Sequence, residues 1–180
     1  FTGFELKTVL EELPTSGRAQ NEVWPSSYWP TYLDSINFRW DSNQLSPAEK
    51  YDQAINGWDA PAGFSSLERS VDDQCELYEP SYYQQLGPLA KTISKNLGNG
   101  QLRNGVDNDG DGNADECDDL DGIETWWGLC HAWVPAALLE KRPLYPVSHN
   151  GVTFYPSDLE ALIIAAYNQS GAEIIGGRCN

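Results

Sequence analysis

Residues 124–140 read ETWWGLCHAWVPAALLE, and this stretch decides the fold that we predict. Cys130 follows shortly after a glycine and precedes an apolar run of good helix formers. Because proline is tolerated in the first turn of a helix, Pro135 predicts a helix that begins between His131 and Val134. Cys130 would then lie at the mouth of that helix, where unpaired backbone amides stabilise a thiolate. The segment therefore presents Cys130 as a candidate nucleophile.

Cys130 also has a plainer interpretation, because cysteine is among the most buried residue types and a buried thiol is inert. The three tryptophans nearby also allow two interpretations. Trp126, Trp127 and Trp133 either wall an apolar channel that shields a thioester from water or are ordinary packing residues. A nucleophilic thiol also requires a base. His131 is adjacent in sequence and would point away from Cys130 on a helix, and His149 lies in a turn, so neither is assigned this role.

An acidic stretch that is separated from Cys130 by 11 residues has the spacing of a calcium-binding loop. Such a loop places oxygen donors at positions 1, 3, 5, 7, 9 and 12, with a glycine at position 6. Gly112 occupies position 6. The predicted Ca2+ ligands are Asp107, Asp109, Asp111, Asn113, Asp115 and Asp118. The aspartate at position 12 is shorter than the usual glutamate, so it reaches calcium directly or through water, or Asp119 replaces it. The alternative is a solvated acidic turn that binds nothing.

Composition limits the setting in which the protein works. The 180 residues include 27 acidic and 11 basic side chains, for a net charge of -16. Nucleic acid and anionic membranes would repel such a chain. The longest apolar stretch, residues 159–167, is well short of the ~20 residues that a membrane span needs. The chain contains no methionine and starts at Phe1. We expect a secreted, extracellular protein processed from a longer polypeptide.

The four cysteines leave two arrangements open. Two disulfides would use all of them, as an even count in a secreted protein suggests. If instead Cys75 pairs with Cys117 and Cys130 stays free, Cys179 needs a partner beyond Asn180. We therefore predict a second chain or a C-terminal fragment, attached through Cys179 and carrying the missing base.

Local patterns predict the remaining elements. Ser46, Pro47 and Glu49 form a capping box with proline at the first helical position. Asn150 and Gly151 form a hairpin turn, and Ser157 is a second expected cap. We expect helices over residues 1–13 (loosely), from 47 to about 55, over 88–97 and over 161–167, a strand over 152–155, and an extended aromatic segment over 24–40 packed across a surface. The helix over 161–167 is apolar on nearly every side, which predicts burial on both faces.

The motifs WWGLCHAWVPAAL (126–138), YWPTY (28–32), DSIN (34–37) and GRCN (177–180) together resemble the secreted transglutaminase elicitor family of oomycetes and some marine bacteria. The match covers most of the chain from about Glu22. The resemblance implies an α+β fold with a papain-like cysteine protease core, mostly helical in this fragment. It also implies two regions, an N-terminal arm or propeptide remnant (1–23) and the nucleophile-bearing part of the catalytic domain (24–180).

The same resemblance implies a calcium-dependent protein-glutamine gamma-glutamyltransferase with Cys130 as nucleophile. The family's catalytic His and Asp have no counterpart in this sequence. Protein glutamine and lysine side chains would be the substrates, joined by an isopeptide bond. Two alternatives stay open: a papain-like cysteine protease, which gives the thioester to water, and a non-enzymatic calcium-binding recognition module.

Overall fold

The computed structural model describes residues 9–41, 43–62, 84–94, 112 and 126–170. Within these ranges the chain forms short 3-10 turns, helices and one hairpin, so the fold mixes helices with a small sheet. The elements are the 3-10 turns η1 (Leu10–Glu12), η2 (Thr31–Leu33) and η3 (Ser35–Asn37), the helix α1 (Pro47–Tyr51), the π-helical turn η4 (Asp52–Asn56), the helices α3 (Pro88–Ile93), α4 (Cys130–Leu139) and α5 (Pro156–Gln169), and the strands β1 (Val147–His149) and β2 (Val152–Phe154).

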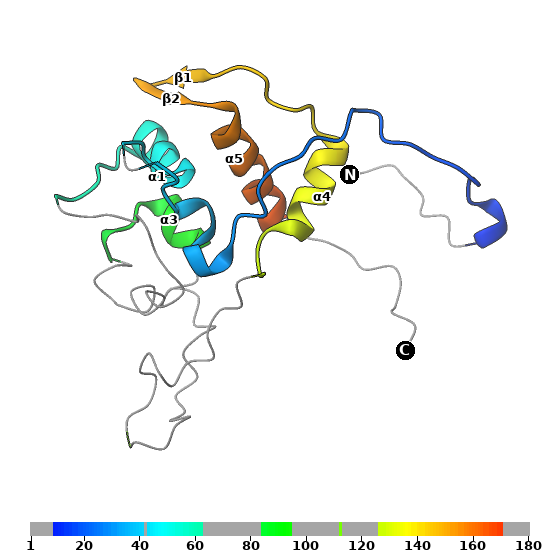
Figure 1. The fold of residues 1–180 in the computed structure, drawn as a ribbon, viewed down its shortest axis with the longest axis horizontal. Helices are drawn as coiled ribbons and strands as arrows, with labels where there is room; N and C mark the ends of the chain where they lie inside the picture. The colour runs from blue at the N-terminus through cyan, green and yellow to red at the C-terminus, as the bar shows by residue number, and fades with distance from the viewer. Residues whose placement is uncertain (1–8, 42, 63–83, 95–111, 113–125, 171–180) are drawn as a thin grey trace.

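Helix α5 occupies the centre of the described fold (Figure 1). It packs against α4 on one side and α1 on the other, and α3 packs against α1 and η3. One hydrophobic cluster joins these elements. Its buried members include Trp24, Trp29, Ile36, Ala48, Leu86, Ala90, Ala132, Ala136, Ala161 and Ile164. Small alanines fill the positions where helices meet, which lets the helix axes approach closely. None of the described helices is long and apolar enough to cross a membrane.

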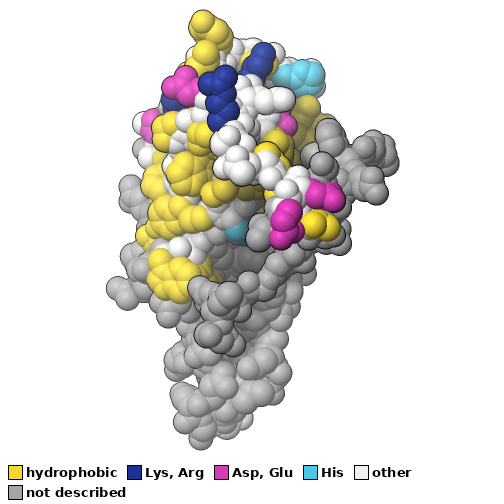
Figure 2. Space-filling view, turned by 90° about the vertical axis from the view of Figure 1, so that its right-hand side faces the viewer, with side chains coloured by type: hydrophobic (Ala, Val, Ile, Leu, Met, Phe, Trp, Pro, Cys, Tyr) yellow, Lys and Arg dark blue, Asp and Glu magenta, His cyan; other side chains and the backbone are white. Residues whose placement is uncertain are grey.

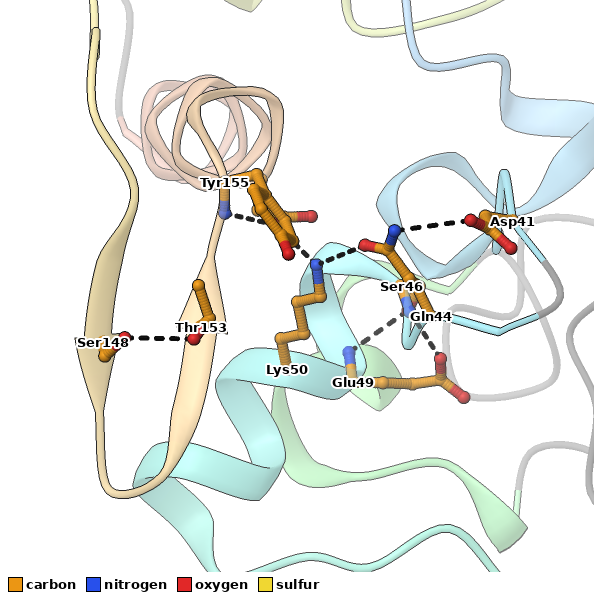
Figure 3. A network of polar contacts seen from close by, with 9 residues as sticks. Asp41, Gln44, Ser46, Glu49, Lys50, Ser148, Thr153 and Tyr155 are labelled. Carbon is orange, nitrogen blue, oxygen red and sulfur yellow. Dashed lines mark hydrogen bonds and ion pairs between the residues drawn. The ribbon is translucent and has the colours of Figure 1, made fainter.

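The capping box predicted at Ser46 is confirmed. Ser46 Oγ accepts a hydrogen bond from Glu49 N at 3.2 Å, and Glu49 Oε2 accepts one from Ser46 N at 2.7 Å (Figure 3). The Glu49 carboxylate also takes two 2.7 Å bonds from Arg39. The helical run continues through the π-turn to Asn56 and ends at Gly57, whose φ of 66° suits glycine. The prediction of a helix to about residue 55 therefore holds.

A second set of buried charges joins α1 to α5. Lys50 Nζ donates to Asp158 Oδ2 at 2.6 Å and lies 5.0 Å from the centre of the Tyr155 ring (Figure 3). Both charged side chains are nearly inaccessible to solvent. Asp158 Oδ2 also accepts a 2.7 Å hydrogen bond from Tyr155 N at the start of α5. The ion pair therefore fixes the start of α5 against α1.

Helix α3 depends on a carboxylate from a distant part of the chain. The fully buried Asp52 accepts hydrogen bonds from Leu89 N at 2.8 Å and Ala90 N at 3.0 Å, at the start of α3. A Cβ at Gly87 would overlap the Asp52 side chain, so glycine is required there. The predicted end of this helix at residue 97 is wrong, because α3 ends at Ile93. Ser94 instead turns to extended geometry.

The aromatic segment 24–40 differs from its prediction. It does not lie extended across a surface, because η2 and η3 fold it back and Trp24 and Trp29 are buried in the core. Hydrogen bonds to a buried carboxylate stabilise these turns. The buried Asp34 carboxylate accepts from Asn37 Nδ2 at 2.9 Å and from Ser94 Oγ at 3.1 Å. Buried hydrogen bonds between these polar side chains therefore stabilise turns in a segment for which its prolines and aromatic residues had suggested an extended conformation.

At the N-terminus, η1 is the part of the expected helix over 1–13 that the structure describes, and residues 1–8 lie outside the described ranges. The hairpin is confirmed: Asn150 and Gly151 have φ of 48° and 81°, and β1 pairs antiparallel with β2. The strand ends at Phe154, one residue earlier than predicted. Asn150 Nδ2 donates to Ala54 O at 2.7 Å, which ties the hairpin to η4.

Helix α5 differs from its prediction in two respects. It begins at Pro156, so Ser157 is not its cap. The reason is that Asp158 satisfies the amide of Tyr155, which places the helix start earlier. Burial is also less even than expected. Ala161 and Ile164 are buried, whereas Leu162 is half-buried and Ala166 is exposed. One face of α5 packs on the core and the other is partly covered.

Candidate functional site

Cys130 is the first residue of α4, one position before the predicted range of helix starts. Its side chain is exposed and its thiol is free, which contradicts the interpretation of a buried inert thiol. The amides of Ala132 and Trp133 bond to Leu129 O at 3.0 and 2.9 Å, so the first turn is already closed here. The site therefore offers solvent a cysteine at the N-terminus of a helix, where partial positive charge gathers.

The position predicted for Pro135 is wrong. It lies inside α4 rather than in its first turn. Proline removes one intrahelical hydrogen bond there, which is unfavourable. Ala132, Ala136 and Ala137 on the same helix are buried against the core. Their packing holds the helix through the proline, and this long-range contact is the reason that the local rule failed.

The backbone just before Cys130 is fixed by the aromatic segment. Leu129 N donates to Tyr28 O at 2.7 Å, and Thr31 N donates to Trp127 O at 2.9 Å. Between these bonds, Pro30 and Gly128 form an isolated antiparallel bridge. A Cβ at Gly128 would overlap the Tyr28 carbonyl, so only glycine fits this contact. We call residues 28–31 together with 127–130 the nucleophile junction.

The three tryptophans near Cys130 have two different roles. Trp126 and Trp127 are 71% and 44% exposed, and their rings meet edge to face at 5.9 Å. Trp133 is half-buried and donates from Nε1 to Trp24 O at 3.1 Å, so it belongs to the packing. The first two remain candidates for the walls of a substrate site.

The outer face of α4 is apolar as well as exposed. Val134 and Leu138 follow Cys130 at intervals of four residues, which places them on one side of the helix. Both side chains are exposed. A band of hydrophobic side chains is visible on this side of the molecule in Figure 2. Cys130 therefore lies at the end of an apolar stripe rather than on a charged surface.

Tyr28 contacts the backbone of Gly128 and Leu129, just before Cys130, and the sequence did not single this contact out. The pKa of Tyr28 is raised above its usual value. Burial is the main cause, followed by the charge and hydrogen bond of Tyr32 and then the negative charge of an ionised Cys130. The residues between Tyr28 and Cys130 number about a hundred, so no local spacing pointed to this contact.

The two histidines make no hydrogen bond to Cys130 in the described part of the chain. His131 Nε2 lies 2.8 Å from Asn168 Oδ1, so its ring is engaged by α5. His149 lies on β1 and is exposed.

The predicted calcium ligands Asp107, Asp109, Asp111, Asn113, Asp115 and Asp118 lie outside the described residues, as do Cys75, Cys117 and Cys179. Gly112 is described and has a φ of 102°. A positive φ favours glycine at this position. Among the residues that the structure describes, no group of three or more His, Cys, Asp or Glu side chains is placed to hold a metal ion.

An exposed, free thiol at the first residue of a helix has features that suit a candidate cysteine nucleophile. Comparison with known proteins identifies the family of this chain. Residues 1–179 match the family described as transglutaminase elicitor, and the chain belongs to that family.

The described fold is similar to the crystal structure of the GP42 transglutaminase from Phytophthora sojae, with 32% sequence identity and a TM-score of 0.54. The match covers 94% of this chain and 45% of the other, so this chain spans less than half the length of that protein. A comparison with curated proteins gave no match.

Proposed function

We propose that the protein is a protein-glutamine gamma-glutamyltransferase in which Cys130 forms the thioester. The observation that carries this proposal is the free, exposed thiol at the first residue of α4, in a chain of the transglutaminase elicitor family. The Cys130 thiolate attacks the γ-carboxamide carbon of a protein glutamine, and ammonia leaves after taking up a proton. A lysine ε-amine then attacks the thioester. The products are an isopeptide bond and the restored thiol.

The first turn of α4 supplies the electrostatic part of this mechanism. Backbone N–H groups at a helix N-terminus point outward and carry partial positive charge. They therefore suit the oxyanion that develops on the glutamine carbonyl during attack. The junction supports this geometry, since the bonds from Leu129 and Thr31 hold the backbone that leads into the turn. Trp126 and Trp127 would line the approach of the glutamine side chain and exclude water.

The base and its orienting acid are proposed to come from further polypeptide. His131 is bonded to Asn168, and the similar solved protein is more than twice as long as this chain, which supports this view. We propose that this polypeptide completes the papain-like core and is joined through Cys179. Intact mass measured before and after reduction tests the link. Loss of a second mass on reduction is expected, and an unchanged mass would contradict a disulfide-linked chain.

Calcium is proposed to act structurally. The acidic stretch over 107–118 precedes Cys130 by a short segment, 119–129, and Gly112 at position 6 has a positive φ, which glycine adopts readily. A bound Ca2+ would neutralise carboxylates that otherwise repel one another and order the segment that leads into the nucleophile. Removal of calcium with a chelator should abolish activity reversibly. Activity that does not change when the chelator is added would show that calcium binding by the loop is not needed for the reaction at Cys130.

The strongly acidic chain, its family and its motifs together support an extracellular protein that acts on other proteins. One assay separates the proposed activity from its rivals. Incorporation of a labelled primary amine into a glutamine-containing protein is measured with and without calcium, for the wild type and for Cys130→Ala. Calcium-dependent incorporation by the wild type alone is the expected result.

Peptide cleavage without amine incorporation would instead indicate a papain-like protease. Equal incorporation by Cys130→Ala would remove this residue as the nucleophile. No reaction by either protein, combined with tight calcium binding, would indicate the recognition module.

A further inference from the structure

A cavity lies where the aromatic segment meets α1 and the start of α5. Its volume is about 390 Å³, within the range of about 300–1,000 Å³ that is typical of ligand pockets. The described residues that line it include Trp29, Trp40, Asp41, Leu45, Pro47 and Lys50. None of the described lining residues belongs to the segment 126–133. The cavity is therefore separate from Cys130.

Trp29, in the wall of this cavity, has two unfavourable features. Its φ is 49°, which bulky residues rarely adopt, and the proline that follows restricts its backbone further. Its Nε1 is buried and has no hydrogen-bond partner among the described residues, and the same holds for Ser26 Oγ in the same wall. Backbone strain persists at ligand-binding sites, and unpaired buried polar atoms are rare in native folds. This wall is therefore better suited to holding a ligand than to stabilising the fold.

The charged residues of the cavity leave one carboxylate without a cation. Lys50 is paired with Asp158 at 2.6 Å, and Glu160 is paired with Arg142 at 2.9 Å, so these four charges cancel. Asp41 also lines the cavity, and its hydrogen bonds within the described part of the chain come from uncharged groups. One net negative charge therefore remains, and Asp41 carries it.

Neutral donors hold the Asp41 carboxylate in place at an exposed position. Its Oδ1 accepts a hydrogen bond from Asn43 N at 2.9 Å. Its Oδ2 accepts one from Gln44 Nε2 at 3.3 Å (Figure 3). Gln44 Oε1 in turn accepts from Lys50 Nζ at 3.4 Å. The carboxylate is thus oriented before any ligand arrives and is open to a cation from solvent.

Trp40 offers an aromatic surface next to this carboxylate. It is 57% exposed, although it follows a buried stretch of the aromatic segment. Phe38 and Trp29 contact its ring edge to face, with ring centres at 5.0 and 6.3 Å, and these contacts fix the orientation of the ring. An indole attracts a cationic group placed over its face, and a nearby carboxylate adds a charge-assisted hydrogen bond. The combination suits the head group of a lysine or an arginine.

We propose that this cavity binds a lysine or arginine side chain of a protein substrate. The cationic head group lies over Trp40 and beside Asp41, and its alkyl stem packs on the apolar side chains of Leu45 and Pro47. Because the cavity is separate from Cys130, the bound residue is not the one that reacts, and the site selects basic segments of the partner. The net charge of -16 favours such a partner. The inference rests on the proposed function only in taking the partner to be a substrate.

Binding of a short peptide tests this site. The peptide consists of glycine and serine with one arginine and a neutral fluorescent label, and it lacks glutamine and lysine, so it cannot react at Cys130. Fluorescence polarisation measures its Kd for the wild type. The ligand control replaces arginine with citrulline, which has nearly the same shape and no charge. We expect saturable binding of the arginine peptide and binding at least about tenfold weaker for the citrulline peptide, because a charge-assisted contact is lost.

Variants of the two proposed contacts locate the binding. Asp41→Asn should weaken binding of the arginine peptide about tenfold, and Trp40→Leu should weaken it about threefold. Asp59→Asn is the matched control for charge, since Asp59 is an exposed carboxylate outside the cavity that also accepts from a glutamine, Gln53, at 3.4 Å. Tyr145→Leu matches the loss of an exposed aromatic ring. Both controls should bind the peptide as the wild type does.

Three results overturn the proposal: no binding by the wild type, equal binding of the arginine and citrulline peptides, or equal losses in Asp41→Asn and Asp59→Asn. The last would mean a general attraction between an acidic protein and a cation. Circular dichroism of each variant checks that the fold is retained, and the comparison of the two peptides needs only the wild type.

The amine-incorporation assay keeps this proposal distinct from the proposed function. If the arginine peptide binds as expected while the wild type incorporates no amine, the transferase proposal fails and the cation site stands. If the wild type incorporates amine and the arginine peptide does not bind, the cation site fails alone.

Discussion

Two regions of the molecule handle polar groups in opposite ways. Around α1, charged side chains are buried and paired: Arg39 with Glu49 and Lys50 with Asp158. We call these four residues, together with Asp52, the charged scaffold. At the nucleophile junction, backbone hydrogen bonds hold the chain and Cys130 is exposed. The contrast indicates that the scaffold fixes the arrangement of the helices, whereas the junction carries the nucleophile that we propose.

The physical reason lies in the cost of removing charge from water. A buried ion requires a partner and further hydrogen bonds. Removal of one member of a buried ion pair in the scaffold therefore leaves the other charge without a partner. The junction holds its reactive atom at the surface, where no such penalty arises. Changes at the junction should therefore alter reactivity more than stability. Four substitutions test this separation.

The largest effect is expected for Lys50→Met. It leaves the buried Asp158 carboxylate without its 2.6 Å partner. Loss of one member of a buried ion pair destabilises by about 3–5 kcal/mol. Urea unfolding measures the change, and the double variant with Asp158→Asn should recover part of it. The alkylation rate of Cys130 in the folded protein should be unchanged, and a large fall there would break the separation of the two regions.

Gly128→Ala should have the next largest effect. The added Cβ would overlap the Tyr28 carbonyl and push apart the two segments of the junction. Overpacking of this kind costs about 1–3 kcal/mol. Amine incorporation should fall by at least tenfold, because the start of α4 shifts. Gly17→Ala is the control, since nothing lies near a Cβ at that position. Full activity in Gly128→Ala would show that the nucleophile junction does not position Cys130.

Ser46→Ala should have a moderate effect that is confined to stability. It removes the hydroxyl that accepts from Glu49 N and caps α1. Loss of such a cap costs about 1 kcal/mol. Ser148→Ala removes an exposed hydroxyl bonded to Thr153 and should change stability little. Thermal unfolding compares the two. Equal melting temperatures would mean that the cap is replaced by another group.

The smallest effect is expected from Tyr167 at alkaline pH. Its folded pKa is raised, first by burial and then by its hydrogen bond to Glu140. A group with a raised folded pKa contributes stability that is present below the unfolded pKa and is lost as pH rises through the folded pKa. The wild type should therefore lose stability above pH of about 10. Tyr167→Phe should show a shallower loss in urea unfolding at several alkaline pH values, and an identical slope would contradict this assignment.

The elements that the sequence predicted well are those whose cause is local. Ser46 and Glu49 cap α1 across three residues, and Asn150–Gly151 sets the hairpin through its own backbone geometry. Features fixed by distant contacts were missed. Asp52 caps α3 from 37 positions away, and Ser94, the residue at which α3 ends, donates a hydrogen bond to the distant Asp34.

The candidate site follows the same rule. A helix start close to Cys130 could be predicted from the glycine and the apolar run that surround it, although Pro135 lies deeper in α4 than expected. The exact start could not, because the residue before Cys130 is held by a hydrogen bond from Leu129 N to the distant Tyr28 O. The contact between Tyr28 and Gly128 joins two segments with no shared sequence pattern. It became visible only when the fold placed them together.

The central claim is that Cys130 carries the acyl group, and trapping the intermediate tests it most directly. The protein, with any disulfide-linked polypeptide retained, is incubated with calcium and a glutamine peptide but no amine, and is then quenched in acid. Mass spectrometry of the Cys130 peptide should show the added mass of the substrate less ammonia, and hydroxylamine should remove it. Amine incorporation that proceeds while Cys130 remains unmodified, or while another residue carries the acyl group, would contradict the account.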